Sequence, residues 1–292
     1  MVRAVVLDGA GQPALADLPE PDGDGELVRV RGCGLCGTDV QKLGRAAPGT
    51  VLGHEVVAED EHGRRVGLVH HLPCGVCERC RAGHQTTCER FPEPTIVPGG
   101  FAERARAAAT IPLPDGVDDA AGTFAEPLAC VLRALERIPR GRVLVVGCGF
   151  AGLLFVQALV RRGDEVVAAD PLPHRLDLAL GYGASPADGP VDAAVLCAHA
   201  GLDGALAALV PGGTLLVFSW LTDPAPVDFE AVLRRELSLV GSCSATPAAM
   251  REAVALLPEL EPIPTVTLPL ERFAEGLELY RSHEAVKVVF TP

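Results

Sequence analysis

The spacing of apolar residues changes near residue 128. Before that point the apolar segments are short and are interrupted by glycine and proline. Residues 26–31 alternate apolar with charged side chains, as a half-buried strand does, and residues 2–7 form another strand-like run. Residues 22–25, Asp-Gly-Asp-Gly, are typical of a turn. This pattern predicts a barrel-type β domain in the first part of the chain.

After residue 128, helical and strand-like segments alternate. Residues 128–138 have helical apolar spacing, and residues 142–146 are a short apolar run that predicts a buried strand. The alternation continues through predicted helices that end at 162, 180 and 209 and predicted strands at 165–169, 193–197 and 214–218. Pro211-Gly-Gly reads as a turn before the last of these strands. Such alternation predicts a parallel, doubly wound sheet, so the fold class is α/β.

Length and patterning together predict two domains. We place the barrel domain at residues 1–128 and the doubly wound domain at residues 129–266. Residues 267–292, which contain a predicted helix at 273–280 and a strand at 285–290, are expected to return to the first domain.

Composition excludes several classes of partner. The net charge is −13, and Lys42 and Lys287 are the only lysines, so we expect neither nucleic acid nor an anionic membrane to bind. No signal-peptide pattern and no apolar run of bilayer length is present. Ten cysteines without an export signal fit a reducing compartment, and we expect a cytoplasmic protein.

Four cysteines fall within fifteen residues and are spaced x2, x2 and x7: Cys74, Cys77, Cys80 and Cys88. This density suits a tetrahedral cation, and four thiolates with no open position predict a structural zinc site. Disulfides are disfavoured by the expected compartment. An iron–sulfur cluster would continue with x3-Cys-Pro, which this stretch does not. Unrelated buried cysteines would rarely cluster so tightly.

A second metal site is suggested by three residues that are far apart in the sequence. Cys36, His54 and Glu126 each carry little information alone, because a single cysteine or histidine is more often structural. Together they form a mixed sulfur, nitrogen and oxygen set, which suits a catalytic zinc with an exchangeable position.

Gly147, Gly149 and Gly152 form a GxGxxG motif that directly follows a predicted strand, and Phe150 and Ala151 open the next helix. The three glycines would allow a tight turn, close approach to a pyrophosphate, and close helix–strand packing, in that order. The helix N-terminus would offer free N–H groups to the phosphates. The alternative is an ordinary glycine-rich turn, but the flanking strand and helix favour a dinucleotide site.

Asp170, 23 residues beyond the first glycine, bears on the choice of dinucleotide. A carboxylate there accepts hydrogen bonds from ribose hydroxyls and repels a 2′-phosphate, which favours NAD over NADP. Arg175 lies close enough in sequence to keep NADP as an alternative.

The motifs, taken in order, resemble those of the zinc-containing medium-chain alcohol and polyol dehydrogenases. The matching pieces span nearly the whole chain: GCGLCGTD, GHE, PCGVCERCRAGHQTTC, PGGFAE, EPLAC, VVGCGFAG and AVKVVF. The closer resemblance is to the sorbitol, threonine and aminocyclitol dehydrogenase branch. In that branch a glutamate, as in Glu126-Pro, stands where simple alcohol dehydrogenases carry a second cysteine.

The resemblance implies a GroES-like barrel joined to a Rossmann domain, with the active site in the cleft between them. It assigns Cys36, His54 and Glu126 to the catalytic zinc, with Glu55 beside it. The four clustered cysteines match the structural zinc lobe, so two zinc ions per chain are expected. A homodimer or homotetramer is also implied.

The resemblance assigns three further roles. Thr38 would begin the proton relay, Asp39 would orient the ligand His54, and Lys287 would meet the cofactor phosphates. His70 falls where family members face the substrate, although it could equally satisfy a backbone carbonyl. The sequence departs from the family at Gln41, which replaces a relay histidine and cannot carry a proton.

We therefore expect a zinc-dependent oxidation of a polar secondary alcohol, such as a polyol, cyclitol or amino alcohol, with NAD. Two alternatives stay open. One is an NADPH-linked carbonyl reductase, which Asp170 disfavours. The other is a non-catalytic relative that keeps only the structural zinc, which would have lost the ligands of the open site.

Overall fold

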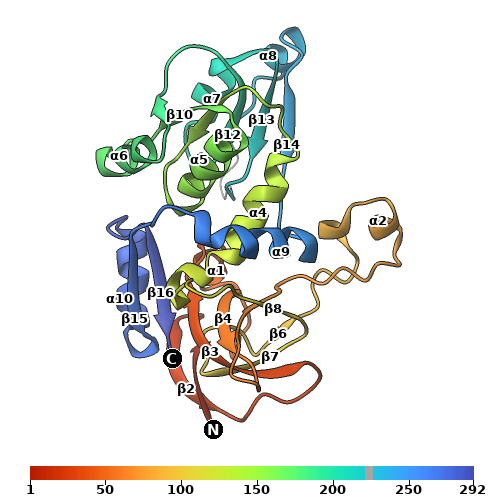
Figure 1. Ribbon diagram of the computed structural model, residues 1–292, viewed down its shortest axis with the longest axis vertical. Helices are drawn as coiled ribbons and strands as arrows, with labels where there is room; N and C mark the ends of the chain where they lie inside the picture. Colours follow the sequence, from red (N-terminus) through yellow and green to blue (C-terminus); the bar gives the residue numbers. More distant parts are fainter. Residues whose placement is uncertain (221–225) are drawn as a thin grey trace. The chain divides into compact units, whose positions relative to one another are not determined.

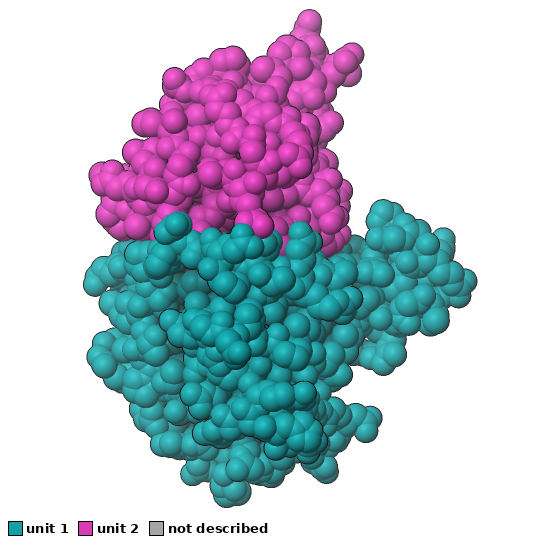
Figure 2. Space-filling view, viewed as in Figure 1, with its two compact units in different colours: residues 1–129, 244–292 teal, residues 130–243 magenta. Residues whose placement is uncertain are grey.

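The computed structural model describes residues 1–220 and 226–292. The chain divides into two compact units: unit 1 comprises Met1–Ala129 and Ser244–Pro292, and unit 2 comprises Cys130–Cys243 (Figure 2). Within the described ranges, no helix is both long and apolar enough to cross a membrane.

Unit 1 is built on an antiparallel sheet in which β3 (Glu26–Gly34) is the central strand. It pairs with β4 (Glu55–Glu59), β7 (Arg104–Ala107) and β16 (Lys287–Thr291). The other strands of the unit are β1 (Val2–Leu7), β2 (Pro13–Leu18), β5 (Arg65–Leu68), β6 (Ile96–Val97), β8 (Thr110–Pro112) and β15 (Thr265–Pro269). The helices of the unit are α1 (Gly37–Lys42), α2 (Glu78–Arg81), α3 (Asp119–Gly122), α9 (Pro247–Leu256), α10 (Phe273–Arg281) and the start of α4 (Ala125–Leu135).

The end of the chain closes the core of unit 1. Phe290 of β16 stacks on Phe273 of α10 with ring centroids 4.5 Å apart. Phe101 meets both rings edge-on, at 5.0 and 5.6 Å. Three rings that are each at most 5% exposed bury a large apolar area and anchor the last residues against the first domain.

Unit 2 is a six-stranded parallel sheet with the order β11-β10-β9-β12-β13-β14. Its strands are β9 (Arg142–Val146), β10 (Glu165–Ala169), β11 (Ser185–Pro186), β12 (Val191–Leu196), β13 (Leu209–Val217) and β14 (Ser238–Gly241). The helices α5 (Phe150–Arg162) and α6 (Pro173–Gly181) pack on β10, α7 (Leu202–Ala208) packs on β12 (Figure 1), and α8 is Phe229–Arg234. The order reverses between β9 and β12, and the first βα turn of the switch carries the glycine motif.

The predicted α/β fold class is confirmed, and three local details differ. The segment Pro211-Gly-Gly lies inside β13 rather than forming a turn before it. The sequence predicts a strand over residues 66–71 with His70 on the same face as Leu68, but β5 ends at Leu68 and His70 lies beyond it. Unit 1 resumes at Ser244 rather than at 267 because α9 packs against β8, and Met250 of α9 lies 3.3 Å from the position of a Cβ on Gly67.

Candidate functional site

Cys36 caps a short helix that follows β3. The N–H of Cys36 donates to Asp39 Oδ2 at 3.1 Å, and the sulfur of Cys36 faces the N–H of Asp39, which forms a reciprocal capping box. The hydroxyl of Thr38, in the first turn of the helix, donates to Cys36 Sγ at 3.4 Å. The cap therefore fixes the thiol, the hydroxyl and a buried carboxylate in one turn of chain.

His54 reaches the same place from a different segment. Gly53 precedes it with a φ of +96°, and a side chain there would also collide with Cys33 Sγ at 2.7 Å, so the turn requires glycine. Nδ1 of His54 lies 3.4 Å from Asp39 Oδ1, and that oxygen also accepts the N–H of Gly53 at 3.3 Å. Asp39 thus holds the backbone and the ring of the histidine together.

The charges around His54 favour a cation. Burial by itself lowers the pKa of His54, but the negative charges of Asp39 and Cys36 outweigh burial and raise that pKa well above its usual range. Burial likewise raises the pKa of Asp39, and the charge of His54 outweighs it and lowers that pKa. The surroundings of the buried imidazole thus favour a positive charge. A divalent cation would supply that charge in place of a proton.

Glu55, the next residue, forms a buried ion pair with Lys287 of β16, and both side chains are 2% exposed. Nζ of Lys287 also donates to the carbonyl of Leu35 at 3.1 Å. Gly34 leaves room for the pair, because a Cβ there would lie 2.1 Å from Glu55 Oε2. The structure therefore places Lys287 beside Glu55, and its predicted contact with cofactor phosphates stays a prediction.

The structure brings Cys36, His54 and Glu55 together, with one ligand atom of each within 4.8 Å of the others. A thiolate, an imidazole and a carboxylate fit the donor set of a zinc site that keeps a position open. Glu126 does not belong to this group of ligand atoms among the described residues. Its role as a ligand stays a prediction.

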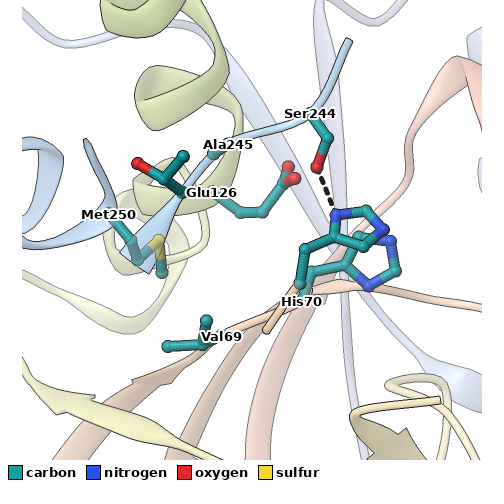
Figure 3. Close-up of a pocket in the computed structure, with 8 residues that line it drawn as sticks. Val69, His70, Glu126, Ser244, Ala245 and Met250 are labelled. Carbon is teal, nitrogen blue, oxygen red and sulfur yellow. Dashed lines mark hydrogen bonds between the residues drawn. The ribbon is translucent and has the colours of Figure 1, made fainter. Parts of the chain in front are cut away.

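Glu126 lies in the first turn of α4, is 7% exposed, and lines a pocket with His70 and His71. The other lining residues are Val69, Ser244, Ala245, Thr246 and Met250. Figure 3 shows the side chains of Glu126 and Ser244 extending toward the His70 side of the pocket. The rings of His70 and His54 are 4.6 Å apart, so the pocket adjoins the metal-ligand group.

Three of these pocket residues, His71, Ser244 and Thr246, were not identified from the sequence as functional. The sequence gives no functional signal for His71, although it follows His70 directly. Ser244 carried no motif, and its unusual feature, a left-handed backbone with a φ of +61°, exists only in the folded chain.

The cysteine lobe has the geometry of a closed metal site. The sulfurs of Cys74, Cys77, Cys80 and Cys88 lie within 4.8 Å of one another. Backbone N–H groups point at them: Cys77 donates to Cys74 Sγ at 3.3 Å, and Cys80 donates to Cys77 Sγ at 3.4 Å. Donors of this kind stabilise thiolates, which are the form that binds zinc.

The pKa values of these thiols indicate which of them need a bound cation to lose a proton. Backbone N–H groups, first that of Glu89 and then that of Cys80, lower the pKa of Cys77 to about 6. Burial raises the pKa of Cys80 to about 12, so its thiol needs a bound cation to lose its proton at neutral pH. The four residues therefore fit a zinc ion that binds as protons leave.

In unit 2 the glycines occupy the positions that the motif requires. Gly147 has a φ of +93°, and Gly149 is the N-cap of α5, which begins with Phe150 and Ala151. A Cβ on Gly152 would lie 1.9 Å from the carbonyl oxygen of Gly147, so the helix can approach the strand only with glycine there.

Asp170 follows β10 and joins two turns of unit 2. Its Oδ2 accepts the N–H of Cys148 at 2.7 Å, inside the glycine motif, and its Oδ1 accepts the N–H of Leu172 at 2.8 Å. Nη1 of Arg175 lies 3.6 Å from the position of a Cβ on Gly149. A fixed carboxylate and a guanidinium therefore border the turn at which a dinucleotide phosphate would bind.

Comparison with known proteins places this geometry in context. Residues 23–115 match the alcohol dehydrogenase GroES-like domain. D-Altritol 5-dehydrogenase from Agrobacterium fabrum is 32% identical over an alignment 288 positions long, and the alignment covers 83% of this chain and 84% of that enzyme. L-Galactonate-5-dehydrogenase from Escherichia coli is 31% identical over 178 residues, so this match spans about half of each protein, 54% of this chain and 52% of that enzyme.

One solved structure has a similar fold along the full length of the chain. A protein assigned as a zinc-binding dehydrogenase from Sinorhizobium meliloti 1021, solved with NADP bound, superposes with a TM-score of 0.87. It is 25% identical in sequence, and the match covers 100% of this chain and 99% of that one.

Proposed function

Because the chain belongs to the zinc-containing medium-chain alcohol and polyol dehydrogenases, we propose that it oxidises a polar secondary alcohol to a ketone with NAD. The protein is a zinc-dependent oxidoreductase that acts on CH–OH groups. The observation that carries the proposal is the convergence of Cys36, His54 and a buried carboxylate beside a pocket lined with polar side chains.

We propose Cys36, His54 and Glu126 as the ligands of the catalytic zinc. Glu55 already compensates the charge of Lys287, so its use as a permanent ligand would compete with that buried ion pair. Glu126 is buried at the wall of the adjoining pocket, where a cation would stabilise its carboxylate. Zinc would supply Lewis acidity toward the alcohol oxygen, and NAD would accept a hydride.

The side chains around the ligands would orient the metal ligand, accept the substrate proton and hydrogen-bond the substrate. Asp39 accepts from the Nδ1 side of His54, which leaves Nε2 of the ring for a metal. Thr38 places a hydroxyl against Cys36, where it can accept the proton of the substrate as the first step of a relay. Burial, with the charge of His54, holds the pKa of His70 far below its usual range, so His70 offers hydrogen bonds rather than proton transfer.

The preference for NAD rests on Asp170. Its carboxylate is fixed beside the glycine motif, and a negative charge there disfavours a 2′-phosphate. Arg175 near Gly149 supports the second candidate, use of NADP, and a structural relative was solved with that cofactor. Rates of cofactor reduction with NAD and with NADP at equal concentration separate the two.

Metal analysis combined with a substrate panel tests the function. The protein should contain two zinc ions per chain and reduce NAD with sugar alcohols or cyclitols. Reaction with primary alcohols only would contradict the polar pocket. One zinc per chain without turnover would identify a non-catalytic relative, which the presence of Cys36, His54 and Glu126 argues against.

To identify the third ligand, Glu126→Gln and Glu55→Gln are compared for zinc content. Loss of one zinc from Glu126→Gln, with two retained by Glu55→Gln, supports the proposed set. The reverse pattern would make Glu55 the ligand.

A further inference from the structure

The pocket beside the metal ligands contains a pair of side chains whose geometry the reaction itself does not require. Ser244 Oγ is hydrogen-bonded to Nδ1 of His71 (Figure 3). The two residues are 173 positions apart in the sequence. Ser244 makes this contact from a left-handed backbone with a φ of +61°. A serine held in that conformation costs folding free energy, and such strained residues are common at functional sites.

The ring of His71 contacts two other rings. It stacks on Phe91 with centroids 3.9 Å apart and planes inclined by 14°, and it meets the ring of His70 at 4.0 Å. The main chain of His70 is held in turn, because the hydroxyl of Thr95 donates to its carbonyl at 2.5 Å. With the ring fixed and Nδ1 bonded to Ser244, Nε2 is the remaining hydrogen-bonding atom of His71.

The pocket offers room for one small group. Its cavity volume is about 10 Å³, which is the space of one water-sized group such as a hydroxyl. The apolar part of the lining comes from Val69, Ala245 and Met250, so a group placed there is directed to the few polar atoms available.

The charges of the side chains around the pocket bear on which groups could enter it. Among its eight lining residues, all of them described, none is a lysine or arginine, and Glu126 is acidic. Burial first, then the charges of His54 and Lys42, lower the pKa of His71 to about 4, so this ring is uncharged at neutral pH. Lys42 itself is exposed and does not line the pocket. A carboxylate entering this space would lose its water without gaining an ammonium or guanidinium partner from the lining.

We propose that Ser244 and His71 form the subsite for an uncharged hydroxyl next to the carbon that is oxidised, so that the enzyme selects neutral polyols over polyhydroxy carboxylates. This inference rests on the proposed function and names the substrate class of the same site. In it His71 contacts the substrate hydroxyl, and Ser244 is a positioning residue that holds the ring in place through Nδ1.

Three probes of matched shape test the subsite on the zinc-loaded enzyme with NAD. Cyclohexanol has the reacting hydroxyl alone, 1,2-cyclohexanediol adds an uncharged hydroxyl, and 2-hydroxycyclohexanecarboxylate adds a carboxylate at the same place. We expect kcat/KM for the diol to exceed that for cyclohexanol by about tenfold, the effect of one good hydrogen bond. The hydroxy acid should react more slowly than either.

Two substitutions of Ser244 are compatible with its left-handed backbone. Ser244→Gly removes the hydroxyl while keeping a residue that adopts positive φ without strain, and should lower the ratio of diol to cyclohexanol activity about tenfold. Ser244→Asn, which tolerates the same conformation and keeps a polar side chain, should restore part of the ratio. Glu236→Gly is the matched control, because Glu236 is an exposed residue with a φ of +52° in unit 2.

Equal losses for the diol and cyclohexanol in Ser244→Gly would show that the pair is only structural and would overturn the proposal. So would a wild-type enzyme that uses the hydroxy acid as well as the diol. If none of the three probes is oxidised, and sugar alcohols and cyclitols are not oxidised either, the proposed function fails. Calorimetric titration of the diol into the wild-type and Ser244→Gly proteins with NADH then still decides the subsite, since binding must weaken in the variant.

Discussion

The two candidate metal sites of unit 1 are built in opposite ways. The cysteine lobe takes all its ligands from residues 74–88, and its nearest donors are backbone N–H groups of the same stretch. The open site brings Cys36, at the start of α1, together with the neighbouring residues His54 and Glu55, at the start of β4, and a network of charges that includes Asp39 and Lys287 surrounds them. A metal site made from one short stretch of chain can stabilise the local fold. In a site made from separate segments, the charges of the surrounding side chains also affect the properties of the ligands.

The contrast predicts different losses when one thiol is removed from each site. Cys36→Ser should lower kcat/KM by about a thousandfold or more, because a catalytic metal is lost or misplaced. Cys74→Ser should instead lower the melting temperature and zinc content, since a structural metal contributes folding free energy. Steady-state kinetics and calorimetric melting of both variants check this, and a catalytic loss confined to Cys74→Ser would invert the assignment.

The buried ion pair of the open centre should matter for stability. Lys287→Met leaves the buried carboxylate of Glu55 without its ammonium partner and should cost about 3–5 kcal/mol of unfolding free energy. The double variant Lys287→Met with Glu55→Gln removes both charges and should recover much of that loss. Urea denaturation measures both variants, and equal destabilisation of the two would mean that the pair contributes through packing alone.

A variant of Asp39 tests whether this carboxylate strengthens zinc binding at His54. Asp39→Asn keeps the shape of the side chain but removes the negative charge beside His54. Zinc affinity at the open centre should fall about 10- to 100-fold, with the lobe zinc retained. Competition with a chromogenic chelator measures this, with Asp60→Asn as a control at a carboxylate bonded to Arg64 in a turn. Unchanged affinity would remove Asp39 from the metal site.

The smallest effect is a difference in pH dependence. The pKa of Cys77 is lowered from 9.0 to about 6, so the stabilisation of its thiolate in the folded lobe is complete above pH 9 and lost as the pH falls through about 6. Zinc should therefore leave the lobe progressively below about pH 6. Metal release followed between pH 5 and 8 checks this, with Cys74→Ser identifying the lobe signal. Retention of lobe zinc at pH 5 would contradict the expectation.

Much of the local structure followed from the sequence. Alternating apolar segments predicted the strands and helices of unit 2, and the glycine motif predicted the turn that Gly147 and Gly152 make. The order of motifs predicted the family. The boundary at Ser244 did not follow, because the helical pattern of α9 fits either unit until its packing against β8 is known.

The sequence by itself determined the parts of this protein whose information is local: the cysteine spacing, the βα turn and the alternation of elements. Only the tertiary structure decided which distant side chains meet, including Lys287 with Glu55 and Ser244 with His71. The physical reason is that spacing along the chain sets local geometry directly. Contacts between remote residues depend on how whole elements pack, and no short motif records that.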